Sequence, residues 1–185
     1  RISNKINYDE IRAIADSKSL KFRFSDKKIL KKFEPVGNIS KKLYEISEKI
    51  RCEKIGTSYF KGVKNNIEKY YQKRIDSLDL KSSEDRIVES FENFLRVKFM
   101  DSKVSKNLDK KLKTYKKDLD EKFKGKINEL NNHIENQERF NSIISELISN
   151  MKLDEEIEEE DKDKSEENKD DRPNNQENKE QNTKE

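Results

Sequence analysis

Apolar residues recur every three or four positions along most of this 185-residue chain. That spacing places them on one side of a helix, so the pattern predicts a series of amphipathic helices. The clearest stripes lie in residues 39–55, 60–75, 87–95, 104–123 and 140–151. Because each stripe must be buried against another helix, the sequence predicts an all-α protein built as an orthogonal multi-helix bundle.

The first element is the most ambiguous. Residues 20–24 alternate apolar and basic side chains, as a strand would, but no turn signal precedes them. We therefore favour one helix that continues through this stretch. Asp9 could cap its start, and Ile11, Ile14 and Ala15 would then face inward.

The glycines indicate where helices end or meet. Gly56 follows the stripe that stops at Ile55, where a left-handed glycine often terminates a helix. Ser58 could cap the next helix, and Gly62 could let two helices approach closely. Gly125 is expected to separate the stripe of residues 104–123 from the one that follows.

The composition changes abruptly after Leu153. Residues 154–185 hold 15 acidic and 6 basic side chains, a net charge of −9, and one large apolar residue, Ile157. Such a segment cannot bury enough apolar surface to offset the entropy lost on ordering. We expect a helical domain over residues 1–153 followed by a disordered acidic linker over residues 154–185.

The remaining 153 residues are basic, with a net charge of +12. This balance raises the possibility of a nucleic-acid-binding bundle, since lysine and arginine neutralise phosphates. However, the chain has 33 lysines and only 9 arginines, and planar recognition of phosphate favours arginine. Binding to nucleic acid is therefore the least favoured interpretation.

Few residues are available for catalysis. The chain lacks a Gly-x-x-x-x-Gly-Lys-[Ser/Thr] phosphate loop and has a single histidine, His133, and a single cysteine, Cys52. We therefore predict no catalytic, cofactor-binding or metal site in this chain. No apolar run reaches the roughly 18 residues of a membrane span, and no signal peptide is recognisable, so a cytoplasmic protein is expected.

The most specific pattern lies between residues 12 and 66. It reads Arg12-x-x-Ala15-Asp16-x-x-x-Leu20, Arg23-x-x-Asp26, Pro35, and then Glu48-x-x-Arg51-x-Glu53-x-x-Gly56-x-x-x-Phe60-x-Gly62-Val63-x-x-Asn66. A later segment reads Glu135-Asn136-Gln137-x-x-Phe140. Together these resemble the N-terminal region of the CobT family, a subunit of the aerobic, ATP-dependent cobaltochelatase. Ser25 and Leu30 stand where that family usually has histidines.

This resemblance implies a non-catalytic region that supports insertion of cobalt into a corrin ring, hydrogenobyrinic acid a,c-diamide, in cobalamin biosynthesis. It implies two partners, the AAA+ subunit CobS, which hydrolyses ATP, and the large subunit CobN, which carries the chelation site. It also implies a homo-oligomeric ring and a linker to a downstream metal-binding domain. ATP, magnesium and cobalt would belong to the full complex and not to this chain.

The motif supplies our candidate structural or interface residues: Arg12, Asp16, Asp26, Glu48, Arg51, Glu53, Gly56, Gly62 and Asn66. Asp26 can open a short helix. Arg12 and Asp16 are four residues apart, and so can share a helix face. Glu48 and Arg51, three residues apart, can do the same. These charges either fix how helices cross or form a docking surface for a partner subunit, and we favour the first interpretation.

One alternative function belongs to a different class. The chain could be a helical adaptor of another MoxR-like AAA+ ATPase, with no corrin chemistry. The loss of the family histidines at Ser25 and Leu30 keeps this alternative open.

Overall fold

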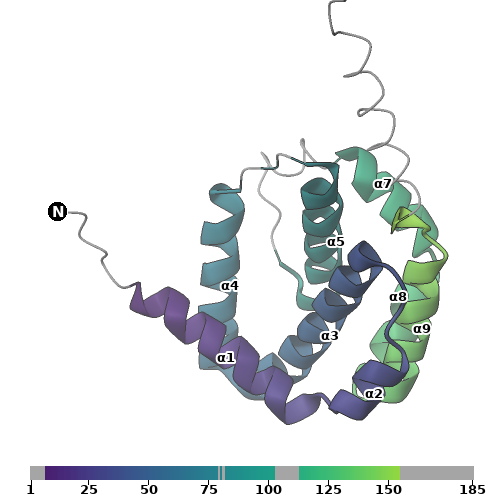
Figure 1. Cartoon of the computed structure of the whole chain (residues 1–185). Coiled ribbons are helices and arrows are strands. Elements are labelled where there is room, and N and C mark those ends of the chain that lie inside the picture. The colour runs from purple at the N-terminus through teal and green to yellow at the C-terminus, as the bar shows by residue number, and fades with distance from the viewer. Residues whose placement is uncertain (1–6, 79, 81, 103–112, 155–185) are drawn as a thin grey trace, which may run out of the picture.

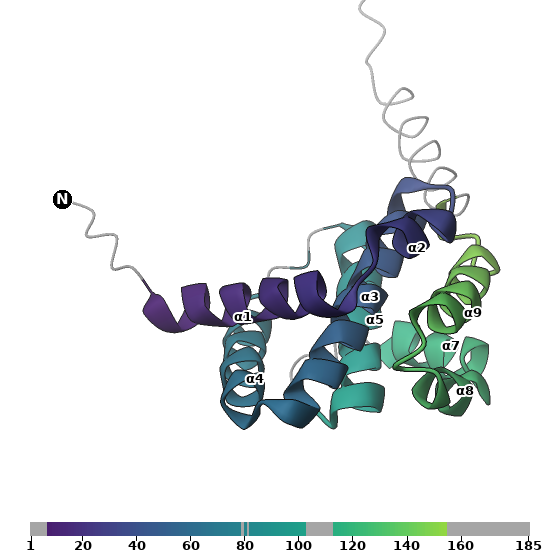
Figure 2. The ribbon, with the colours of Figure 1, turned by 90° about the horizontal axis from the view of Figure 1, so that it is seen from below.

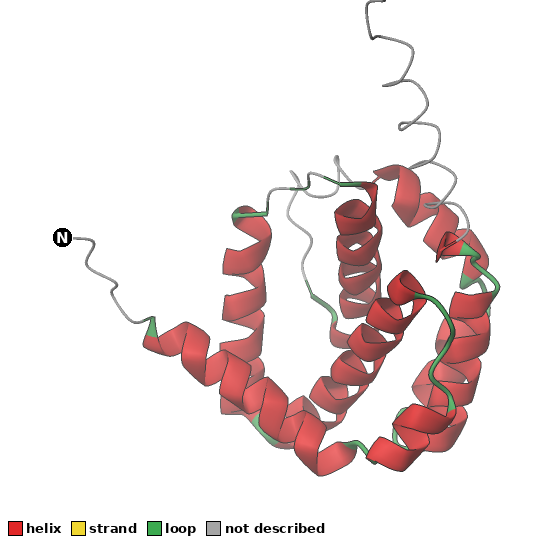
Figure 3. Cartoon of the chain, in the orientation of Figure 1, coloured by secondary structure: helices red, strands yellow, loops and turns green. Residues whose placement is uncertain are grey.

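A computed structural model describes residues 7–78, 80, 82–102 and 113–154. Within these residues the chain forms eight helices and no strand, as Figure 3 shows. The prediction of an all-α orthogonal bundle is confirmed. The predicted disordered linker lies outside the described residues except for Asp154, as do residues 104–112 of the stripe predicted to begin at residue 104.

In chain order the helices are α1 (Tyr8–Phe24), α2 (Lys27–Lys32), α3 (Asn38–Tyr59), α4 (Lys61–Asp76), α5 (Ser83–Met100), α7 (Lys113–Lys122), α8 (Lys126–Asn132) and α9 (Gln137–Ser149). Helix α3 is central, because α1, α4, α5 and α9 all pack against it (Figure 1). Figure 2 shows α1 and α4 on one side of α3, and α7, α8 and α9 on the other. Helix α2 packs on α9 and closes the bundle at one end.

The apolar core is unevenly divided between these two sides. The main cluster joins α3, α5, α7, α8 and α9, and its fully buried members include Leu43, Ile50, Phe91, Leu95, Phe123, Leu130, Phe140, Ile144 and Ile148. The cluster between α1, α3 and α4 has only three buried members, Leu20, Cys52 and Ile67. The α1–α4 side therefore has little apolar contact and depends more on polar contacts.

Helix α1 confirms that residues 20–24 are helical, but two details of the prediction were wrong. The cap is Asn7, whose side chain accepts a hydrogen bond from the backbone of Glu10, and not Asp9. Ile11 and Ala15 are exposed and Ile14 is half-buried. The buried residues of the inward side are Ala13 and Leu20.

Neither of the two central glycines has its predicted role. Helix α3 continues past Gly56, where a Cβ atom would lie 2.2 Å from Leu20 Cδ2. Gly56 therefore allows the close crossing of α1 over α3. Around Gly62 a Cβ atom would meet nothing within 4 Å. Ser58 lies inside α3 and α4 starts from Phe60, so Ser58 is not its cap. Gly125, with a φ of 78°, does separate α7 from α8 as expected.

The start of α3 is capped by a residue from the other end of the chain. Its own N-cap residue, Gly37, offers no side chain. Asp154 accepts hydrogen bonds from the backbone N–H groups of Ile39 and Ser40, at 2.9 and 3.1 Å. Burial tends to raise the pKa of Asp154, but these bonds outweigh it and lower the pKa. The segment that follows α9 is thus fastened to the N-terminus of the central helix.

The two glycines make a matched pair for a stability test. Gly56→Ala should destabilise the protein by about 1–3 kcal/mol through overpacking against the buried Leu20 side chain. This cost exceeds the gain of about 0.5–1 kcal/mol that alanine brings to a helix. Gly62→Ala meets no neighbour and should be neutral or slightly stabilising. Urea unfolding of both variants measures the difference, and equal stabilities would contradict a close crossing at Gly56.

Candidate functional site

The charged residues of the motif meet inside the bundle, where α1 ends beside the middle of α3. Glu48 and Arg51 are 0% and 1% exposed. Arg51 Nε donates to Glu48 Oε2 at 2.8 Å, and Nη2 donates to Glu48 Oε1 at 2.9 Å. Burial alone would lower the pKa of Arg51, but the hydrogen bonds and charge of Glu48 raise it, so the side chain stays charged. The predicted pairing of these residues on one helix face is present.

Arg51 also binds two carbonyl groups from distant parts of the chain. Its Nη2 donates to the carbonyl oxygen of Phe24, the last residue of α1, and its Nη1 donates to that of Ile134 at 3.0 Å. Ile134 lies in the turn between α8 and α9. One side chain therefore joins α1, α3 and the α8–α9 turn, and these buried carbonyls are satisfied without water.

A cavity of about 610 Å³ opens beside this pair, lined by Phe24, Ile55, Tyr59, Phe60 and Arg51 among others. Arg51 borders it, but its guanidinium is already engaged by Glu48 and the two carbonyls. The cavity thus has an apolar wall, and α3 contributes no unpaired charged group to it.

Asp26 and Gln137 form a second link between the motif segments. Asp26 caps α2 by accepting from the backbone N–H of Lys28 at 2.7 Å, as predicted. Gln137 Oε1 accepts from the Asp26 N–H at 2.7 Å, and Gln137 Nε2 donates to the Asp26 carbonyl at 3.0 Å. Gln137 Nε2 also lies 3.3 Å from Ser25 Oγ. The later motif segment thereby positions the junction of α1 and α2 on α9.

Both positions that carry histidine in the CobT pattern are structural here. Ser25 accepts the hydrogen bond from Gln137. Leu30 packs against the main apolar cluster, and its carbonyl accepts from the Tyr44 hydroxyl at 3.0 Å. Neither side chain can act as an imidazole would, in binding a metal ion or in transferring a proton.

Glu53 faces the opposite side from Arg51 and begins a larger ionic network. It is 1% exposed and accepts a hydrogen bond from Ser17 on α1. Its Oε2 lies 2.8 Å from Arg96 Nη1 on α5. Arg96 is itself 4% exposed, and burial would lower its pKa, but the charges of Glu53 and Glu92 raise it. Glu53 therefore connects α1, α3 and α5.

Glu92 is the centre of this network. It pairs with Lys49 at 2.8 Å, Arg74 at 2.9 Å and Arg96 at 3.0 Å. Burial would raise the pKa of Glu92, but these three cations bring it down to about 2. The Tyr71 ring lies against the Arg96 guanidinium, 4.4 Å from centroid to Cζ. Four helices, α1, α3, α4 and α5, are thus joined by side chains where apolar contact is sparse.

Sequence reasoning missed this network beyond Glu53. A signal was available, because Glu92 and Arg96 lie four residues apart and flank the apolar residues Phe94 and Leu95. Charged residues are almost never fully buried unless they are paired, so this spacing is compatible with a buried ion pair.

The first part of the motif links α1 to α4. Asn66 Nδ2 donates to Asp16 Oδ2 at 2.8 Å. Arg12 is exposed, and within the described residues the predicted Arg12–Asp16 pair does not form. Asp16 is turned towards α4, so Arg12 is the one charged candidate residue left on the outer side of α1.

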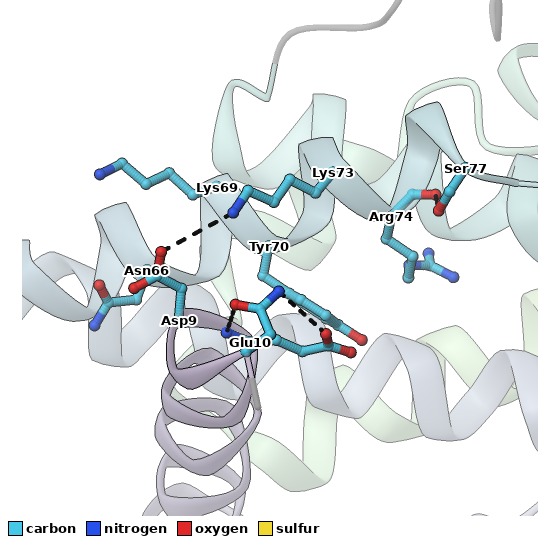
Figure 4. A pocket seen from close by; sticks show the side chains of 9 residues that line it. Asp9, Glu10, Asn66, Lys69, Tyr70, Lys73, Arg74 and Ser77 are labelled. Atoms are coloured by element: carbon cyan, nitrogen blue, oxygen red, sulfur yellow. Dashed lines mark hydrogen bonds and ion pairs between the residues drawn. The ribbon is translucent and has the colours of Figure 1, made fainter. Parts of the chain in front are cut away.

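Figure 4 shows a shallow cavity of about 190 Å³ between the first turn of α1 and α4. Lys73 Nζ and Asp9 Oδ2 lie 4.0 Å apart across it, and both side chains are largely exposed. Solvent screens such a pair strongly. A second cavity, of about 270 Å³, borders Glu53, Glu92 and Arg96, whose charges are already paired. Neither cavity presents a free buried acid or base.

The described residues also offer little for metal or thiol chemistry. They contain no group of three or more histidine, cysteine, aspartate or glutamate side chains that could hold a metal ion. Cys52 is buried, and burial together with the charge of Glu48 raises its pKa to about 12, so it remains a neutral thiol. None of the described helices is long and apolar enough to cross a membrane.

A family model described as cobalamin biosynthesis protein CobT matches residues 3–185. The chain belongs to the CobT family. No curated protein and no solved structure matches it. Seven of the nine candidate residues taken from the CobT motif join, cap or closely approach other helices in this structure, whereas Arg12 and Gly62 lie on the surface.

Replacing Arg51 tests the buried pair. Arg51→Ala strands the Glu48 carboxylate and should cost about 3–5 kcal/mol in the free energy of unfolding. Arg12→Ala removes an exposed arginine from the same CobT motif and should change stability by less than about 0.5 kcal/mol. Denaturant unfolding followed by circular dichroism measures both variants. A fully stable Arg51→Ala protein would show that the pair does not hold the fold.

The lowered pKa of Glu92 predicts that the protein loses stability in acid. Its pKa is lowered from 4.5 to about 2, so its contribution is fully present above pH 4.5 and is lost as the pH falls towards 2. Glu92→Gln should therefore be less stable than the wild type by about 3 kcal/mol near pH 6, with the gap closing between pH 4.5 and 2. Glu45→Gln, at an exposed position of α3, is the control. A gap that does not change with pH would contradict this role of Glu92.

Proposed function

We propose that this chain is the non-catalytic assembly and coupling region of a cobaltochelatase subunit. In this proposal it supports ATP-dependent insertion of cobalt into hydrogenobyrinic acid a,c-diamide, in the cytoplasm. The observation that carries the proposal is the family match over residues 3–185, which supports a role in cobalamin biosynthesis.

The internal pairing of charges supports a non-catalytic role. Glu48, Glu53, Glu92, Arg51 and Arg96 are all more than 90% buried, and each is engaged by another charged side chain. A catalytic acid or base must reach the substrate and change its protonation state, and these groups are held away from both. In the proposed complex, CobS hydrolyses ATP, CobN holds the tetrapyrrole, and cobalt is the substrate.

The attachment of the segment after α9 to the central helix supports a coupling role. Asp154 ties the segment after α9 to the N-terminus of α3. From α3, Arg51 reaches α1 and the α8–α9 turn, and Glu53 reaches α5. A displacement applied at the acidic linker would therefore be passed to the central helix and from there to its neighbours. In a homo-oligomeric ring with CobS, this connection would transmit movement between subunits.

One observation favours a second candidate function, a helical adaptor of another MoxR-like AAA+ ATPase. At the two positions where the CobT pattern has histidine, Ser25 is hydrogen-bonded to Gln137 and Leu30 is packed in the core. If those histidines serve the chelation reaction in other members, this chain has exchanged them for structural side chains.

Reconstitution tests the proposal. The full-length protein, combined with CobS and CobN, should be required for cobalt insertion into hydrogenobyrinic acid a,c-diamide, measured by the absorbance change of the corrin. The 185-residue chain alone should hydrolyse no ATP and insert no cobalt. Stimulation of the AAA+ ATPase without any cobalt insertion would favour the adaptor. ATP hydrolysis by the isolated chain, lost on a single substitution in it, would refute the non-catalytic assignment.

A further inference from the structure

The outer side of α1 carries an exposed apolar row. Tyr8, Ile11 and Phe22 are 76%, 55% and 86% exposed, and Ala15 is also exposed. Their spacing of three, four and seven residues aligns them along one side of the helix. From Tyr8 to Phe22 the row extends roughly 21 Å, at about 1.5 Å per residue.

The bundle leaves this row uncovered within the described residues. Helix α1 packs against α3 and α4 through its other side, where Ala13 and Leu20 are buried. Figures 1 and 2 show α1 at the outside of the bundle, with α3 and α4 to one side of it. Exposed apolar residues scattered singly need no explanation, but an aligned row on a peripheral helix marks an interaction surface.

The borders of the row are basic. Arg12 and Lys18 lie on opposite sides of it and Arg23 lies near its end, and all three are exposed. The acid nearest the middle of the helix, Asp16, faces α4 and is bound by Asn66. The surface is thus an apolar seam between positive borders.

We infer that the outer side of α1 binds an amphipathic helix of a partner protein. This partner helix has a narrow apolar seam that is bordered by aspartate or glutamate. The row occupies three a positions and one d position of a heptad, with Lys18 at the other d position on its edge; this is the narrow seam of a helix pair, whereas a helix buried in a membrane surface or a core has a face of about 100° or more. The positive borders are complementary to acidic flanks.

Two occupants from this chain itself fit less well. A second copy of α1 would bring Arg12 and Lys18 against equally charged residues of its neighbour. The segment 155–185 is acidic, but Ile157 is its one large apolar residue, so it cannot fill a seam of four positions. The inference concerns the surface alone and does not depend on the corrin reaction.

Two designed peptides of 21 residues test the inference. Both carry leucine at positions a and d, and one has glutamate and the other lysine at positions e and g. Titrated into the full 185-residue chain at 0.15 M salt and followed by fluorescence anisotropy, the glutamate peptide should bind at least tenfold more tightly than the lysine peptide.

Substitutions on α1 locate the contact. Ile11→Asp and Phe22→Asp should each weaken binding of the glutamate peptide at least tenfold, with unchanged circular dichroism. Val36→Asp, at another exposed apolar position, should bind as the wild type does. The double change Arg12→Glu with Lys18→Glu should reverse the preference in favour of the lysine peptide.

Several results would overturn the inference. Equal binding of both peptides, or binding that survives Ile11→Asp, would show that the seam and its borders are not the site. A dimer in sedimentation that Ile11→Asp abolishes would assign the surface to a second copy. Binding to phosphatidylglycerol vesicles that the same substitution abolishes, without peptide binding, would assign it to a lipid surface.

Discussion

The buried ion pair of Glu48 and Arg51 is the interaction on which the arrangement of the helices depends. Its two charges lie in the middle of the central helix, and neither is more than 1% exposed. A buried charge is tolerated only when it is paired and its remaining hydrogen-bonding groups are satisfied. Arg51 meets this requirement by binding the last carbonyl of α1 and a carbonyl of the α8–α9 turn. The need to satisfy the hydrogen-bonding groups of Arg51 therefore brings α1, α3 and the α8–α9 turn together.

Joining helices through buried ion pairs suits the composition of the chain. Only 30% of its residues are hydrophobic and 44% are charged, so the apolar core is concentrated on the side of α3 that faces α5 and α9. On the α1–α4 side, Glu53, Glu92 and Arg96 connect helices that share few apolar residues. Such networks are costly if one partner is missing, so they favour one packing arrangement over others. The proposed role in transmitting movement between subunits would benefit from that rigidity.

Local periodicity accounts for what the sequence could predict. The stripes of Ile50, Phe91 and Phe140 identified helices and core correctly, and the three-residue spacing of Glu48 and Arg51 indicated a pair. The carbonyl partners of Arg51 were not predictable, since they lie 27 and 83 residues away in the chain. For the same reason, the close approach predicted at Gly62 occurs at Gly56 instead. Which glycine lies under a crossing helix depends on tertiary packing, and not on where a stripe ends.

We conclude that the buried charges of the CobT motif, Glu48, Arg51 and Glu53, hold the helices together and are not a contact surface. A double-mutant cycle with Glu48→Leu and Arg51→Met, read on unfolding and on association with the proposed AAA+ partner, separates these two roles. The double variant should be more stable than the sum of the single losses implies, by more than about 2 kcal/mol, because no unpaired charge remains. This variant should also bind the partner as the wild type does. A stable double variant that no longer binds would show that these charges form the contact surface.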